Sequence, residues 1–321
     1  MSVVKEIASV AEIAMPVDEK WSVRRCRYRP EAGGAGRVCI VTGIHGDEMM
    51  GQLIVFGVAQ RIMHGQEHLH GIVDLYPMLN PLGLDIGERL VPSGTRLDMN
   101  RSFPGTPDGT PMEAMCHQIV EEVRGADLVL DIHASTQNKS ELYEVRVSAP
   151  ATPETIASAR ALCPELIWVY PERTAYNASL TGALSALGTS AMILEADERR
   201  HRPQEIAGKV IEGIFCKLSE MGLWTGEAVT PPREVPCVMT QEDMLRVTCL
   251  HPGIYLPEDM IGKRVEKGQT LGRIFDALSG VVIEEVTAPC QALVFSERSY
   301  SAVYPGTLLA RLYKTKEEEQ P

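Results

Sequence analysis

Apolar positions in the first two thirds of the chain form short continuous runs separated by longer amphipathic stretches. Runs that are apolar throughout are typical of strands buried on both faces of a sheet. Such strands are predicted over residues 37–43, 71–81, 126–133, 166–170 and 190–195. Helices are predicted between and after them over residues 48–63, 112–124, 153–162, 178–187 and 203–221. This alternation predicts an α/β fold with a mostly parallel or mixed sheet flanked by helices.

Residues 82–111 interrupt the alternation. They are rich in glycine and proline and show no clear period, so a long loop is predicted there. Loops of this length inside a compact domain usually carry function.

The pattern changes again near residue 226. The segment TGEAVTPPREVP has the composition of a linker, and short strands separated by turns follow it as far as Tyr313. This part of the chain predicts a small all-β barrel or sandwich. We therefore expect two domains, residues 1–226 and residues 227–321, the second ending in a solvated, disordered tail (KTKEEEQP).

Composition and charge exclude several functional classes. Hydrophobic residues make up 44% of the chain and charged residues 23%, as in ordinary soluble globular proteins. The net charge of −12 argues against general nucleic-acid binding, although a few arginines in a pocket can still bind an anionic substrate. No apolar run approaches the roughly 20 residues of a membrane span. Lys5, Glu6 and Glu12 interrupt the N-terminal stretch, so it does not resemble a secretory signal.

The cysteines indicate the compartment. All eight are scattered along the chain without a C-x-x-C pair, and several lie in apolar stretches. This usage predicts reduced, partly buried thiols and a cytoplasmic protein.

A histidine and a glutamate stand three positions apart in VTGIHGDEMMG (residues 41–51), directly after the first predicted strand. In the first turn of the following helix, His45 and Glu48 would share a face and converge on one ion. Zinc takes neutral imidazole and carboxylate ligands, and a catalytic site keeps one position open for water. An isolated H-x-x-E is more often a polar loop, so the metal hypothesis depends on the rest of the chain.

Two further strands end in polar residues. His133 ends the strand at residues 126–133, and Glu195 ends the strand at residues 190–195. The carboxyl ends of parallel strands line one crevice, so these side chains are expected near His45 and Glu48. Glu195 is either an exposed strand end or a general base beside the metal. Asp131 either orients an imidazole or is simply a partly buried strand-end carboxylate.

The long loop contributes positive charge through Arg89, Arg96 and Arg101, the last of which follows Asn100. A guanidinium can polarise a scissile carbonyl or bind a carboxylate through two parallel hydrogen bonds. The loop is therefore predicted to contribute to substrate binding or catalysis.

Four motifs occur in a fixed order along the chain: G-x-H-G-D-E, D-M-N-R-S-F-P-G (residues 98–105), D-I-H and L-E-A. In that order they resemble the succinylglutamate desuccinylase/aspartoacylase family, which belongs to the zinc carboxypeptidase-like hydrolases. The resemblance covers nearly the whole chain, because these proteins also carry a C-terminal β-barrel domain. It implies a zinc-carboxypeptidase-like sheet in the first domain.

The resemblance also implies roles for single residues. His45, Glu48 and His133 would bind one Zn²⁺ per chain, and Glu195 would be the general base. The residues that would hold the substrate carboxylate are Asn100 and Arg101.

The arginine that polarises the carbonyl has two candidates. Arg89 begins an R-x-x-P stretch common in the family and is our prediction, with Arg96 as the alternative. The sequence departs from its relatives after Glu195, where Asp197, Arg199, Arg200 and His201 replace residues that are often small. This departure concerns the substrate pocket more than the chemistry.

Two other groups of reactive side chains receive structural interpretations. His64, His68 and His70 (MHGQEHLHG) fit a solvated helix end better than a metal site. Cys290 has no nearby histidine in the sequence to act as a base, so it is assigned to packing.

The function predicted from these features is a zinc amidohydrolase that removes the acyl group from a small anionic N-acylated amino acid or a related amide. A zinc carboxypeptidase acting on peptide C-termini is the enzymatic alternative, because its catalytic parts would be the same. Neither the acyl group nor the amine can be named from the sequence. No nucleic-acid or membrane partner is expected, and a homo-oligomer is compatible with the sequence.

A non-catalytic binding module is the second alternative. The segments V-x-K-G-Q-x-L-G (residues 265–272) and V-T-A-P (residues 286–289) look like the biotinyl/lipoyl carrier fold. A carrier needs a lysine at its hairpin tip, and residues 274–289 contain none. The barrel is instead expected to narrow the mouth of the active site, which would favour small substrates.

Overall fold

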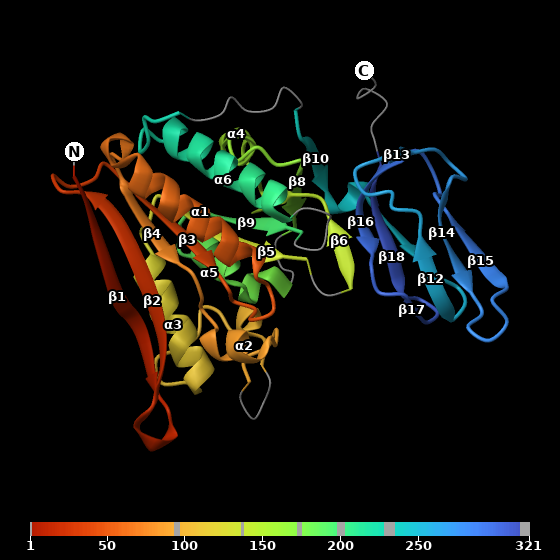
Figure 1. The fold of residues 1–321 in the computed structure, drawn as a ribbon, viewed down its shortest axis with the longest axis horizontal. Helices are drawn as coiled ribbons and strands as arrows, with labels where there is room; N and C mark the ends of the chain where they lie inside the picture. The colour runs from red at the N-terminus through yellow and green to blue at the C-terminus, as the bar shows by residue number, and fades with distance from the viewer. Residues whose placement is uncertain are drawn as a thin grey trace.

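The computed structural model describes residues 2–92, 97–135, 138–171, 175–197, 203–227 and 235–314. Within these ranges the chain forms a larger α/β unit and a smaller all-β unit that lie side by side (Figure 1). None of the helices described is both long and apolar enough to cross a membrane.

A mixed sheet forms the centre of the larger unit. In the described part of the chain it has nine strands in the order β1-β2-β4-β3-β5-β9-β7-β8-β10. Their bounds are β1 Val3–Ala14, β2 Lys20–Pro30, β3 Arg37–Thr42, β4 Ile72–Tyr76, β5 Leu128–Ala134, β7 Glu144–Ser148, β8 Leu166–Tyr170, β9 Ala191–Ala196 and β10 Cys237–Thr240. The strands β4, β3, β5 and β9 are parallel to their neighbours in that group. The predicted fold class, a mostly parallel or mixed sheet flanked by helices, is confirmed.

Helices cover both faces of this sheet. On one face are α1 (Met50–His64), α4 (Pro153–Arg160) and α6 (Pro203–Glu220), and on the other are α3 (Pro111–Val123) and α5 (Leu180–Ala186). Successive residues of a strand point to opposite faces, so Val38 and Ile40 pack into the first layer and Cys39 and Val41 into the second. Two-sided burial explains why the sequence of this strand is apolar throughout.

The fold differs from the sequence-based prediction in the long loop and in one strand, and the prediction also lacked β1, β2 and β7. The loop predicted over residues 82–111 overlaps the short helix α2 (Pro81–Ile86) and a 3₁₀ turn, Met99–Arg101. Helix α2 begins with a proline, and the side chain of Asn80 caps it by accepting a hydrogen bond from the Gly83 amide. A helix this short has too few turns to show a hydrophobic period. The predicted strand at residues 71–81 is also shorter, because β4 ends at Tyr76.

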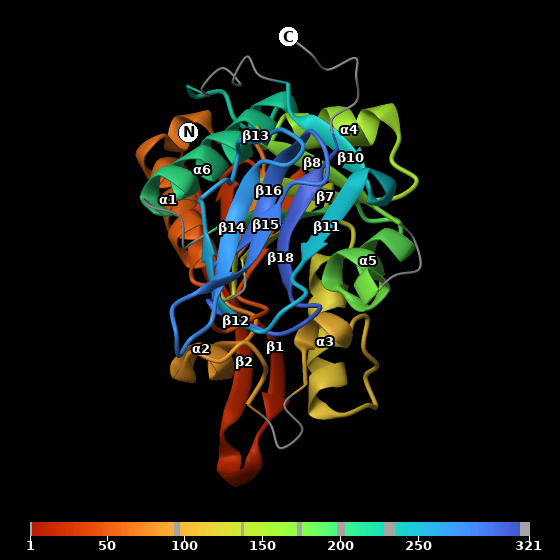
Figure 2. The same ribbon diagram turned by 90° about the vertical axis from the view of Figure 1, so that its right-hand side faces the viewer.

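The smaller unit is built from two facing sheets. One contains β11 (Met244–Thr248), β18 (Leu308–Tyr313), β16 (Ala292–Arg298) and β13 (Arg264–Val265), and the other β15 (Val282–Thr287), β14 (Thr270–Phe275), β12 (Gly253–Pro257) and β17 (Ala302–Val303). Apolar side chains from both sheets, among them Tyr255, Leu271 and Leu312, form the core between them. Figure 2 looks onto this unit. The predicted C-terminal all-β structure is confirmed.

Each unit contributes a strand to the other. Strand β10, which follows the linker, pairs with β8 of the large sheet, while β6 (Lys139–Glu141) pairs with β16 of the smaller unit. An apolar cluster that includes Trp168, Phe295 and Tyr313 fills the contact between them. The first sheet of the smaller unit therefore packs directly against the β7–β8–β10 end of the large sheet.

Candidate active site

A tight turn after β3 carries the first two candidate ligands. Gly43 has a φ of 70°, a conformation that side chains disfavour. A Cβ at Gly46 would overlap the backbone of Gly83, so only glycine allows the turn to lie against α2. Helix α1 begins at Met50, so His45 and Glu48 are brought together by this turn and not by the first turn of a helix, as the sequence had suggested.

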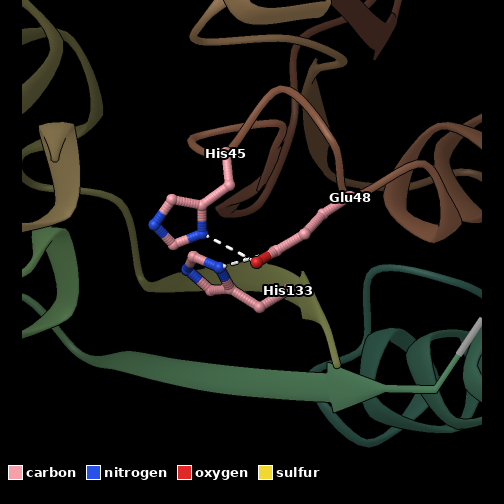
Figure 3. A group of neighbouring side chains, drawn as sticks. All are labelled: His45, Glu48 and His133. Atoms are coloured by element: carbon pink, nitrogen blue, oxygen red, sulfur yellow. Dashed lines mark hydrogen bonds and ion pairs between the residues drawn. The ribbon is translucent and has the colours of Figure 1, made fainter. Parts of the chain in front are cut away.

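His133 completes a group of three converging donors. It lies near the end of β5, and the ligand atoms of His45, Glu48 and His133 all lie within 4.8 Å of one another (Figure 3). The Nδ1 atom of His45 is 2.8 Å from Oε1 of Glu48, and the Nδ1 atom of His133 is 3.0 Å from Oε2. The amide of Ala134 donates a second hydrogen bond to Oε2. All three side chains are buried.

Carboxylates outside this group orient both imidazoles. The Nε2 atom of His45 is 3.1 Å from Oδ1 of Asp98, and the Nε2 atom of His133 is 3.2 Å from Oδ2 of Asp131. A carboxylate can only accept, so each Nε2 donates to its carboxylate, and each Nδ1 faces Glu48. With a cation bound between the three side chains, each Nδ1 would give up its hydrogen and direct a lone pair at the cation. Carboxylate–histidine pairs of this kind typically orient metal-binding imidazoles.

The charges of the cluster favour a bound cation. Within the described residues, the carboxylates of Glu48, Asp98 and Asp131 are accompanied by one guanidinium, that of Arg89, which donates to Oε1 of Glu48 over 2.5 Å. Burial opposes ionisation of Glu48, but the imidazoles of His133 and His45 hold the pKa of its carboxyl well below the usual range. Two imidazoles and a carboxylate are the donor set that catalytic zinc sites use, so these residues fit a zinc ion.

The predicted substrate-binding residues that the structure describes lie beside the three converging donors. Asn100 is buried: its Oδ1 accepts from the amide of Leu180, and its Nδ2 is 3.3 Å from Nε2 of His133. Arg101 is exposed, and its guanidinium donates to the carbonyl of Asn100 over 2.6 Å. Arg89 contacts Glu48, whereas Arg96 lies outside the described residues.

Glu195 lies on the strand next to His133. The register of β5 and β9 pairs the two residues directly, so their side chains leave the sheet on the same side. Its Oε1 is 2.7 Å from NH1 of Arg146, and 12% of its side chain is exposed. Among the described residues, Glu195 is not part of the converging donor group, which fits a base beside a metal better than a ligand.

Two residues of the site were not assigned from the sequence. Asp98 belongs to the D-M-N-R motif, and its partner His45 is 53 positions away, so only the folded chain reveals the contact. Arg146 lies on β7, a strand that the sequence did not predict because Glu144 and Arg146 break its apolar pattern. The spacing of Asp98 before Asn100 was the available signal, since its side chain accepts from the Asn100 amide over 2.9 Å.

The remaining candidates lie away from the site or outside the described residues. In the described ranges, His64, His68 and His70 form no metal-binding group. Cys290 is half-buried and, like the other seven cysteines, a free thiol. Asp197 is buried, while Arg199, Arg200 and His201 are outside the described ranges.

Comparison with known proteins identifies relatives of the chain. The family model for the succinylglutamate desuccinylase/aspartoacylase catalytic domain matches residues 35–218. The N-α-acetyl-L-2,4-diaminobutyric acid deacetylase of Halomonas elongata is 26% identical over 285 residues, 86% of this chain and 82% of that protein.

Solved structures extend the likeness to both units. A succinylglutamate desuccinylase/aspartoacylase from Rhodobacter sphaeroides superimposes with a TM-score of 0.81 at 21% identity, covering 98% of this chain and 96% of that one. The product-bound ectoine utilization protein EutE from Ruegeria pomeroyi gives 0.79 at 20% identity, covering 98% and 95%. A metallo-carboxypeptidase from Burkholderia cenocepacia gives 0.55 at 13% identity, covering 68% and 65%. The whole chain therefore shares its fold with the first two proteins.

Proposed function

Since this chain belongs to the succinylglutamate desuccinylase/aspartoacylase family, we propose that it is a zinc-dependent deacylase that removes the acyl group from a small N-acylated amino acid or a related amide. The observation that carries this proposal is the convergence of His45, Glu48 and His133 on one point. The related Halomonas protein is by name a deacetylase of an N-acetylated amino acid, which supports this substrate class.

In this proposal, His45, Glu48 and His133 hold one zinc ion per chain. The chemistry that zinc supplies in such a site is polarisation of a carbonyl and activation of water. Glu195, on the strand beside His133, takes the proton of the attacking water and passes it to the leaving amine. Arg89 stabilises the negative charge that develops on the carbonyl oxygen, since its guanidinium already lies against Glu48.

Arg101 recognises a carboxylate of the substrate. Its side chain is exposed beside the buried site, and a guanidinium binds a carboxylate through two parallel hydrogen bonds. Asn100 supports Arg101 in two ways. Its buried side-chain oxygen accepts a hydrogen bond from the backbone amide of Leu180, which holds the loop in place, and its backbone carbonyl accepts one from the Arg101 guanidinium. The substrate is therefore a small anionic N-acyl compound.

We assign the chemistry to residues 1–226 and the narrowing of the site mouth to residues 227–321. The packing of the smaller unit against the β7–β8 end of the sheet supports this division of roles, since β7 carries the partner of Glu195. We assign the enzyme to the cytoplasm, because all eight cysteines are free thiols.

A zinc carboxypeptidase is the second candidate function. The fold likeness to the metallo-carboxypeptidase from Burkholderia cenocepacia favours it, and the same catalytic residues would serve. That likeness covers 68% of this chain, whereas the deacetylase relative aligns with 86% of it. The deacylase is therefore the better supported candidate.

A substrate panel tests the reaction class. The zinc-loaded protein is incubated with N-acetyl, N-succinyl and N-formyl amino acids and with dipeptides that carry a free C-terminus. We expect release of the free amino acid from at least one acyl series and no cleavage of the dipeptides. Cleavage of the dipeptides alone would identify a carboxypeptidase and contradict the deacylase proposal.

Glu195→Gln tests the mechanism. The change keeps the size of the side chain but removes its ability to accept a proton, so kcat should fall by about 10²–10⁴-fold with zinc content unchanged. Near-normal kcat would mean that Glu195 is a structural carboxylate, and lost zinc would mean that it is a ligand. Zinc and kcat are measured on the same preparation.

A further inference from the structure

Arg146 is a buried cation between two facing carboxylates. Strands β7 and β9 are antiparallel, and their register places Glu144 directly opposite Glu195. Like charges in this position repel each other across a sheet. Arg146, two residues after Glu144 and so on the same face, bonds both: its NH1 is 2.7 Å from Oε1 of Glu195, and its Nε is 2.6 Å from Oε1 of Glu144.

An aromatic ring lies against this guanidinium. Trp168 on β8 is the register partner of Arg146, and the Cζ atom of Arg146 lies 4.9 Å from the centroid of its ring. An aromatic contact together with bonds to two carboxylates suits the rigid, many-donor fork of arginine better than the single ammonium of lysine. Arg146 is 5% exposed, so solvent screens these contacts weakly.

We propose that Arg146 is a positioning residue for Glu195, holding one carboxylate oxygen so that the other faces the reaction; this rests on the proposed role of Glu195 as general base. In the described part of the chain, the ion pair with Arg146 engages Oε1 of Glu195. We assign the acceptance of the proton to the other oxygen, Oε2. A base held by one oxygen keeps the fixed geometry that proton transfer needs.

Arg146 also lies close to a buried carboxylate at the contact with the smaller unit. The NH2 atom of Arg146 is 3.8 Å from Oε2 of Glu141, a fully buried residue on β6, which pairs with β16 of the smaller unit. Lys139 donates to Glu141 over 2.6 Å, and Arg311, on β18 of the smaller unit, donates to it over 3.0 Å. Burial opposes ionisation of Glu141, but Lys139, Arg146 and Arg311 together lower its pKa to about 2. The C-terminal sheet therefore belongs to the electrostatic surroundings of Glu195.

A purely structural role for Arg146 predicts different behaviour. If Arg146 only neutralised Glu144 and Glu195, replacing it would reduce stability. Any effect of this replacement on kcat would then be the same whether or not Glu195 is also replaced. A positioning residue acts through Glu195, so its contribution disappears once Glu195 can no longer accept a proton. Measurements on single and double variants separate the two roles.

The experiment compares Arg146→Met, Glu195→Gln and the double variant as zinc-loaded proteins, with kcat, KM, zinc content and thermal midpoint measured for each. We expect Arg146→Met to lower kcat by about 100-fold, the size of effect of a misplaced catalytic group, with KM and zinc content little changed. The double variant should be no slower than Glu195→Gln alone. Arg146→Lys, which keeps the charge without the fork, should recover part of the lost kcat.

Arg25→Met is the matched control. Arg25, on β2, is similarly buried, at 8% exposure, and its NH1 lies 2.7 Å from Oε1 of Glu122 on α3. This variant should lower the thermal midpoint but leave kcat unchanged. If Arg146→Met does not fold, Arg146→Lys takes its place in the cycle.

Two outcomes would overturn the positioning role. One is a near-normal kcat in Arg146→Met when Glu195→Gln is inactive. The other is that Arg146→Met lowers kcat by the same factor in the wild-type protein and in Glu195→Gln. Full activity of Glu195→Gln would instead contradict the proposed general base, so the two failures are distinguishable.

Discussion

Two buried clusters of charged side chains flank the same strand, one around the start of β3 and one beyond its end. In the first, the fully buried Asp74 accepts two hydrogen bonds of 2.7 Å from Arg27 and a third of 2.7 Å from Arg37. Close by, Arg25 pairs with Glu122 over 2.7 Å. Each charge in this cluster meets an opposite charge at hydrogen-bond distance. The arrangement ties β2, β3, β4 and α3 together and is structural.

The second cluster is built differently. Among the described residues, three carboxylates (Glu48, Asp98 and Asp131) contact the two imidazoles, and one of them, Glu48, is bonded by the guanidinium of Arg89. The two imidazoles turn their Nδ1 atoms toward one carboxylate and their Nε2 atoms outward. Buried charge alone therefore does not distinguish a functional site. The convergence of donors and the excess of negative charge do.

The largest effect is expected from removing a ligand of the second cluster. The wild-type protein should carry about one zinc per chain, as one three-ligand site implies. His45→Ala or His133→Ala should lose the metal to a mild chelator and, with it, all measurable hydrolysis. His64→Ala, an exposed histidine in the last turn of α1, is the control and should keep both. Full metal occupancy in the ligand variants, measured by elemental analysis, would contradict the site.

Breaking the first cluster should affect stability and leave the metal in place. Asp74→Asn preserves the side-chain volume but removes the charged partner of Arg27 and leaves Arg37 with Glu122 alone, at 3.5 Å. Removing one partner of a buried ion pair costs about 3–5 kcal/mol. The free energy of unfolding should fall by this amount in denaturant titrations, while zinc affinity of the folded protein stays the same. A weakened metal affinity without lost stability would show that the two clusters are not separate.

A smaller change is expected when an orienting carboxylate of the second cluster is neutralised. Asp131→Asn can still accept a hydrogen bond from Nε2 of His133, but without its negative charge it no longer makes the imidazole a stronger donor to a metal. Losses of this kind typically weaken metal affinity by about 10- to 100-fold. Asp127→Asn is the matched control, because Asp127 lies just before the opposite end of β5 and bonds the amide of Arg37. Equal zinc affinities in both variants, from competition with a chelator, would remove Asp131 from the site.

The same contrast explains how much of the molecule could be predicted from its sequence. Strands β3, β5 and β9 are apolar because helices cover both faces, and their ends show where His45, His133 and Glu195 lie. Strand β7 was missed, because the charges of Glu144 and Arg146 are compensated only by residues of other strands. Local pattern carries information on burial, whereas ion pairs between distant segments exist only in the folded chain.

The edge hairpin of β1 and β2 and the carboxylate of Asp98 were missed for related reasons. Strands β1 and β2 alternate buried and exposed residues irregularly, since β2 carries arginines that face the first charged cluster. Asp98 looked like one more polar loop residue until the fold placed it against His45. The candidate metal ligands themselves could be predicted because each follows or ends a strongly apolar strand.

The smallest effect is expected from Arg101, whose exposed guanidinium can contact a substrate, in comparison with Arg27, whose guanidinium bonds Asp74. Arg101 is exposed beside the second cluster, while the fork of Arg27 is fully used on both oxygens of Asp74. Arg101→Lys keeps the charge but loses the bidentate geometry, so KM should rise by about fivefold, the equivalent of one net hydrogen bond. Arg27→Lys loses the same geometry and should lower stability with KM unchanged. Steady-state kinetics on an N-acyl amino acid and on the corresponding acyl amine without a carboxylate complete the test. If Arg101→Lys raises KM equally for both compounds, Arg101 does not bind the substrate carboxylate.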